Sequence, residues 1–146
     1  MRAVHVVLGV LCGALFAGAG VWGAWCWHKV RHSALFWRLL RAGQAAVVLE
    51  AALGGLMVAT GRRGNTLHLV YGLLPILVSF VAEQLRIAAA QTILDGRGIE
   101  SAAAVGELPE VEQRAIVISI MQREMGVMVL AVLVILVLLF RAATTS

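Results

Sequence analysis

Four long apolar segments dominate the 146-residue sequence and restrict what it can fold into. A helix needs about 20 apolar residues to cross the roughly 30 Å hydrocarbon core of a bilayer. Because that core offers the backbone no hydrogen-bond partners, a crossing segment is helical unless it belongs to a closed barrel. The sequence therefore predicts an all-α integral membrane four-helix bundle, with spans at about residues 3–27, 38–60, 66–86 and 120–141.

The composition agrees with burial in lipid. Hydrophobic residues make up 61% of the chain and charged residues only 14%, whereas charged residues are about a quarter of a soluble domain. The length suits one domain. Four spans use more than half of it, so we predict a single four-span transmembrane domain with short loops and no room for a separate soluble catalytic domain.

The first apolar segment resembles a secretory signal in its opening residues, because Arg2 precedes a Leu/Val core and small residues follow. The apolar stretch continues to Trp27, however, which is long enough to span a membrane. We interpret it as a retained helix. Cys12 and Cys26 would lie about 21 Å apart along that helix, too far for a disulfide, so we expect them to be small apolar fillers.

The last two helices are expected to extend beyond the membrane. The third should run from Thr66 to Leu94, and the fourth unbroken from Pro109, a typical helix start, to Arg141. A helix of that length is about 50 Å long, well above the thickness of the hydrocarbon core. We therefore predict a short antiparallel stalk in the cytoplasm at about residues 87–119.

Basic residues indicate the orientation, because cytoplasmic loops are enriched in Lys and Arg. The loop after the first span and the region between spans three and four carry twice as many as the opposite side. This distribution places both termini on the outer side. Lys29 is the only lysine among 12 basic residues, which is typical of a GC-rich bacterial genome, so we predict a multi-pass protein of the bacterial cytoplasmic membrane. The two groups are Lys29, Arg31, Arg38, Arg41, Arg86, Arg97, Arg114 and Arg123 on one side, and Arg2, Arg62, Arg63 and Arg141 on the other.

Small residues recur along one face of the first span at Gly9, Gly13, Ala17 and Gly20. Helices in lipid associate through close packing rather than burial from water, and small residues permit a close approach. We predict that this stripe is a helix-packing face.

Glu50 is the most informative polar residue, because it lies deep in the second span. A carboxylate at that depth costs about 2.5–3.5 kcal/mol or more and has to be neutral, paired or hydrogen-bonded. Three interpretations stay open. Glu50 is a proton or cation site or contacts a quinone-like cofactor; or it is neutral and bonds a carbonyl freed by Pro75; or it pairs with a partner subunit.

Two further groups of residues are candidates for binding. Glu83 and Arg86 lie at a similar depth to Arg38 and Arg41, which predicts an interfacial ion-pair cluster or, alternatively, a contact to an anionic ligand or lipid headgroup. His5, Met57 and His68 fall at similar depth near the outer face. These residue types are ligands of haem and copper, although each alone is more often an interfacial polar group.

Catalytic motifs such as HExxH and GxSxG are absent from the sequence. We therefore expect a non-enzymatic membrane subunit or accessory factor that packs into a larger bacterial complex or a homo-oligomer. The alternatives are an electron-transfer subunit that binds haem b or quinone, and a small proton or cation transporter or channel that uses Glu50. The expected partners are the bilayer, anionic lipid headgroups and other membrane subunits; no catalytic residue, metal site or nucleic-acid partner is assigned.

Overall fold

The computed structural model describes residues 2–61 and 65–145 of the chain. Over these residues it is all-helical and contains no strand. The elements are α1 (Arg2–His28), α2 (Ala34–Ala59), α3 (Thr66–Asp95), the short α4 (Ala102–Val105) and α5 (Glu110–Thr144). In the part of the chain that is described, α1, α2, α3 and α5 are long and apolar enough to cross a membrane. The prediction of four long apolar helices is thereby confirmed, and the fold is compatible with a multi-pass membrane protein.

Local signals set where the helices begin. The Ser33 hydroxyl caps α2 by accepting a hydrogen bond from the Phe36 backbone N–H, and it also accepts one from the Trp22 indole of α1. Asn65 caps α3 in the same way. Pro109 directly precedes α5, so this helix begins at Glu110, one residue later than the sequence suggested. Arg62, Arg63 and Gly64, between α2 and α3, lie outside the described residues.

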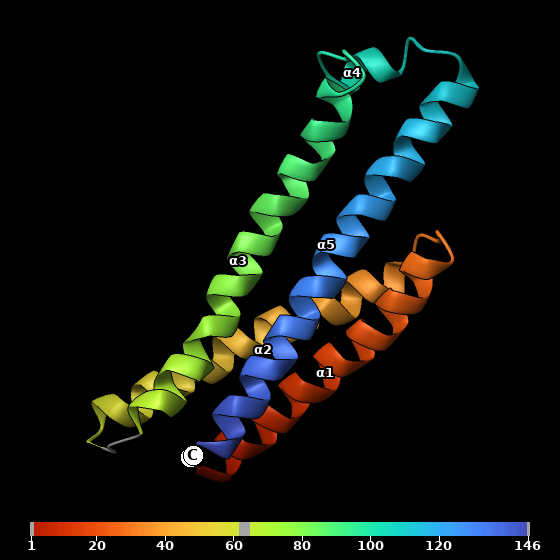
Figure 1. Ribbon diagram of the computed structural model, residues 1–146. Coiled ribbons are helices and arrows are strands. Elements are labelled where there is room, and N and C mark those ends of the chain that lie inside the picture. The colour runs from red at the N-terminus through yellow and green to blue at the C-terminus, as the bar shows by residue number, and fades with distance from the viewer. Residues whose placement is uncertain (1, 62–64, 146) are drawn as a thin grey trace.

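Three of the long helices run roughly alongside one another, and α2 lies across them at an angle (Figure 1). α3 and α5 form an antiparallel pair, α1 packs against both α2 and α5, and α2 contacts α3 more sparingly. Trp27 near the end of α1 lies beside Gly126 of α5. The part of α5 before Gly126 and the part of α3 paired with it therefore project beyond α1, and we call this segment the projecting pair (Figure 1).

The apolar core lies where α1, α2 and α5 meet. Two glycines allow aromatic rings to fill it, because a Cβ at Gly43 would lie 3.2 Å from the Phe16 ring and one at Gly23 would overlap the ring of Phe36. Cys12 and Cys26 are free and buried, as expected of apolar fillers. The central residues are Cys12, Phe16, Phe36, Leu40, Met125, Val129, Val132 and Ile135.

The small residues of α1 divide between its buried and open faces. Gly20 is buried, and a Cβ there would lie 3.1 Å from Val132 of α5, while a Cβ at Gly9 would lie 3.1 Å from the Glu50 carboxyl of α2. A Cβ at Gly13 would meet nothing within 4 Å, and Ala17 is exposed. The intramolecular packing face of α1 therefore uses only part of the predicted stripe. Its buried members are Cys12, Phe16, Ala19, Gly20, Gly23 and Cys26.

Candidate functional site

His5 and Glu50 meet between the start of α1 and the middle of α2. His5 Nδ1 lies 3.0 Å from Glu50 Oε1, and the side chains are only 21% and 17% exposed. The ring is not oriented for a well-formed N–H···O hydrogen bond, so Nδ1 has no hydrogen-bond partner despite this short distance. Two lone pairs at 3.0 Å would repel each other, so this contact is favourable only when a proton lies on one of the two atoms. The pair is therefore a candidate site for a proton.

His68 of α3 completes a three-helix group that we call the His5–Glu50–His68 cluster. Its ring contacts that of His5 edge to face, with centroids 5.8 Å apart. His68 Nδ1 lies 2.9 Å from the carbonyl oxygen of Ala142 in α5. Because a carbonyl oxygen only accepts, Nδ1 carries the hydrogen, and Nε2 of the neutral ring is then a free proton acceptor.

The cluster is incomplete as a hydrogen-bonded assembly. Glu50 Oε2 is buried and has no hydrogen-bond partner. Gly9 lies directly against the other oxygen, where even a methyl group would crowd it. A carboxyl with one unused oxygen in an apolar setting is costly to maintain. Such a group is a stronger candidate for function than for stability.

Haem ligation does not suit this arrangement of the histidines. Bis-histidine ligation places the iron and the porphyrin plane between two imidazole nitrogens, but the His5 and His68 rings are in direct contact. Met57 is half-buried on α2. Among the described residues, no group of three His, Cys, Asp or Glu side chains could hold a metal ion. A haem here would require the two rings to separate.

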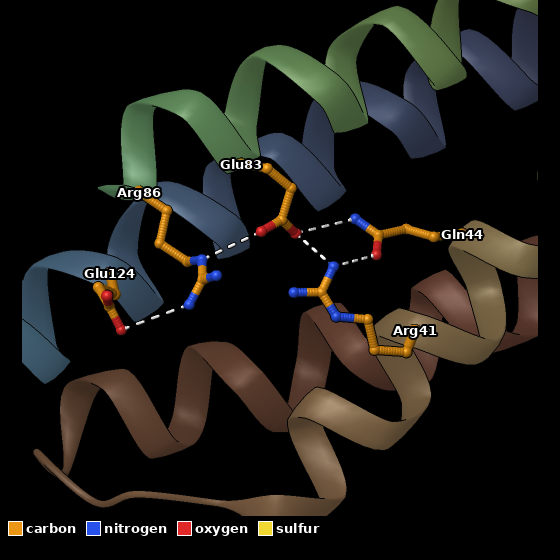
Figure 2. A network of polar contacts seen from close by, with 5 residues as sticks. All are labelled: Arg41, Gln44, Glu83, Arg86 and Glu124. Atoms are coloured by element: carbon orange, nitrogen blue, oxygen red, sulfur yellow. Dashed lines mark hydrogen bonds and ion pairs between the residues drawn. The ribbon is translucent and has the colours of Figure 1, made fainter. Parts of the chain in front are cut away.

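A second polar assembly links α2, α3 and α5, and we call it the Arg41–Glu83 network (Figure 2). The Arg41 guanidinium donates to both the Gln44 side-chain oxygen and Glu83 Oε1. On the other side, Arg86 Nε donates to Glu83 Oε2 at 3.1 Å. Arg86 then reaches Glu124 of α5 at 3.8 Å. Each oxygen of Glu83 thus has a cationic donor, and two guanidinium groups balance two carboxylates.

The sequence predicted an interfacial cluster of four charged residues, and the structure brings three of them together in this network. Arg41, Glu83 and Arg86 come together, while Arg38 is exposed and takes part in none of these contacts. Gln44 and Glu124 were missed. Gln44 lies one helical turn after Arg41 and so on the same face, a spacing that could have indicated it; the place of Glu124 depends on how α5 aligns with α3.

Glu50 also has a partner that sequence reasoning did not name. The expected candidates were a carbonyl freed by Pro75 or another subunit, whereas the structure places His5 beside it. α3 continues helically through Pro75, which is buried. The oblique course of α2 brings Glu50 toward the start of α1, and nothing in the sequence encodes that angle directly.

No family model, curated protein or solved structure matches this chain. Its class is therefore defined by its own features. Over the described residues it is all-helical, with four apolar helices of membrane-spanning length. Between these helices lie a balanced network of charges and an incomplete cluster of titratable groups.

Proposed function

We propose that this chain is a multi-pass protein of the bacterial cytoplasmic membrane that acts as a small proton transporter or channel through the His5–Glu50–His68 cluster. The observation that carries the proposal is the meeting of three titratable side chains from three apolar helices. One of them, Glu50, keeps a buried oxygen without a partner. Ionisable groups within membrane-spanning helices commonly belong to proton or ion pathways.

The proposed chemistry is the uptake and release of a proton by neighbouring groups. A proton can reside on either His5 Nδ1 or Glu50 Oε1, which lie 3.0 Å apart, and its transfer between them requires the His5 ring to turn into hydrogen-bond geometry. The unpaired Glu50 Oε2 gives a second position for a proton, and the free Nε2 of His68 gives a third. A group that can be protonated at several adjacent atoms suits transfer better than permanent storage.

A polar face of α3 supports a path from this cluster toward the Arg41–Glu83 network. His68, Ser79 and Glu83 lie on that face, and all three are buried or half-buried. The Ser79 hydroxyl is buried and has no hydrogen-bond partner, so it is available to a water molecule or a proton in transit. In the proposed orientation this path runs from the outer side toward the cytoplasm, and the projecting pair forms the cytoplasmic stalk.

Proton flux in proteoliposomes tests the proposal. With a potassium diffusion potential and a pH-sensitive dye inside the vesicles, we expect Glu50→Gln to abolish the flux carried by the unmodified protein. Glu112→Gln is the matched control, because Glu112 is exposed near the start of α5, and it should leave the flux unchanged. Flux that persists in Glu50→Gln, or that is absent from the unmodified protein, contradicts the proposal.

A second candidate function is that of a non-enzymatic subunit that packs against another membrane protein or another copy of itself. It is favoured by the open face of α1, where Ala14, Ala17 and Ala24 are exposed along the same helical stripe as Val10 and Val21. Small exposed residues at helical spacing allow a partner helix to approach closely. A native mass measurement in mild detergent tests this: a strictly monomeric particle with no co-purifying protein contradicts it, and Ala17→Leu should disrupt any complex found.

A further inference from the structure

A cavity of about 700 Å³ lies where the projecting pair leaves the end of α1. α3 and α5 form its walls and Trp27 of α1 contributes to its lining. Along α5 its lining passes from Ser119 and Arg123 to Val127 and Leu130, from polar to apolar side chains. The residues that line this cavity belong neither to the His5–Glu50–His68 cluster nor to the Arg41–Glu83 network. The principal lining residues are Trp27, Arg97, Ser119, Arg123, Val127 and Leu130.

Gly126 allows Trp27 to lie close to the backbone of α5 in this cavity. A Cβ at position 126 would lie 3.0 Å from two carbon atoms of the indole and 3.1 Å from its nitrogen. Gly126 itself is buried, while Trp27 is 36% exposed. No hydrogen-bond acceptor among the described residues takes the indole N–H. The tryptophan therefore presents both an apolar ring and an unused donor at the cavity.

Arg97 and Arg123 are both exposed, and neither forms an ion pair within residues 2–61 and 65–145. Three other arginines, Arg41, Arg86 and Arg114, each contact a carboxylate. Two unpaired guanidinium groups at one cavity favour an anion, and their planar donors match the oxygen atoms of a phosphate.

We propose that this cavity binds the phosphate of an anionic phospholipid. Arg97 and Arg123 contact the phosphate oxygens, the Trp27 indole lies at the level of the headgroup, and an acyl chain follows Val127 and Leu130. A lipid fits better than a free phosphate because the cavity continues from basic to apolar residues, as an amphiphile requires. This inference rests on the membrane insertion in the proposed function but not on proton transfer.

Lipid binding to the purified full chain in a neutral detergent tests the proposal. Native mass spectrometry during titration with phosphatidylglycerol should detect a bound lipid, and phosphatidylcholine should bind at least about tenfold more weakly. The double variant Arg97→Gln/Arg123→Gln should lower the affinity for phosphatidylglycerol at least about tenfold, because each charge-assisted contact is worth about that factor. Both arginines are exposed, so the variant should fold normally.

The control is Arg2→Gln/Arg114→Gln, which removes the same charge from exposed positions outside the cavity and should leave the affinity unchanged. Equal binding of both lipids, or equal losses in the two double variants, overturns the proposal. Inorganic phosphate that binds as tightly as the lipid, with the same dependence on Arg97 and Arg123, reassigns the cavity to a soluble anion and overturns the lipid assignment. Flotation with vesicles of phosphatidylcholine alone reports membrane insertion separately, so its failure is distinguishable from a failure of this cavity.

Discussion

The His5–Glu50–His68 cluster and the Arg41–Glu83 network are both polar assemblies between apolar helices, yet they are completed to different degrees. In the network, each oxygen of Glu83 receives a guanidinium donor and the charges balance. In the cluster, Glu50 keeps one oxygen without a partner and the His5 contact lacks hydrogen-bond geometry. The difference teaches that a saturated assembly holds helices together, whereas an unsaturated one is available for exchange.

Exposure separates the two assemblies less sharply. In the network the Arg41 side chain is 49% exposed and Glu83, Arg86 and Glu124 are 22–27% exposed, while His5 and Glu50 in the cluster are 21% and 17% exposed. Each partly exposed ion pair contributes up to about 1 kcal/mol, and Glu83 forms two of them. The network is the more satisfied assembly, so removing a network member should affect stability and removing a cluster member should affect activity.

Loss of the central carboxylate of the network should have the largest effect on stability. Glu83→Ala leaves Arg41 and Arg86 without their shared acceptor, and we expect it to lower the free energy of unfolding by about 2 kcal/mol. Denaturant-induced unfolding in detergent, followed by helical circular dichroism, measures this loss. The exposed Glu112→Ala serves as control. If both variants lose the same small amount, the network does not hold the helices together.

Glu50→Gln should have a smaller effect on stability, of about 1 kcal/mol or less, because the amide has nearly the same shape and removes no balanced ion pair. The same unfolding measurement gives the comparison directly. A loss as large as that of Glu83→Ala would show that the cluster also serves to hold helices, and the distinction between the two assemblies would fail.

The smallest expected effects come from two glycines of α1, of which Gly9 faces the cluster and Gly13 does not. Gly9→Ala places a Cβ 3.1 Å from Glu50 Oε1, so the carboxyl has to shift, and we expect proton flux to slow roughly threefold, equivalent to less than 1 kcal/mol in the barrier. Gly13→Ala faces open space one turn later and should alter neither flux nor stability by more than about 0.5 kcal/mol. Identical flux in the two variants would mean that the Glu50 position is not critical.

Sequence reasoning predicted the four long helices because apolar length is a strong, local signal. It also placed His5 and His68 at similar depth, since helical rise fixes the height of a residue once the orientation is assumed. It could not supply the partner of Glu50 or the role of Glu124. Those depend on the crossing angle of α2 and on the alignment of α5 with α3, which arise from many packing contacts rather than from any short pattern.

The hydrogen bond between His68 and the Ala142 carbonyl makes the final turn of α5 a structural part of the cluster. Carbonyl groups in the last turn of a helix have no partner within the regular helix; this one accepts from the His68 imidazole of α3 and also from the backbone N–H and the hydroxyl of Thr145. Unwinding that turn would release the hydrogen on Nδ1, and the imidazole could then change tautomer and present a donor where it now presents an acceptor. Winding or unwinding of the last turn of α5 would thereby decide which ring nitrogen of His68 donates a hydrogen and which accepts one.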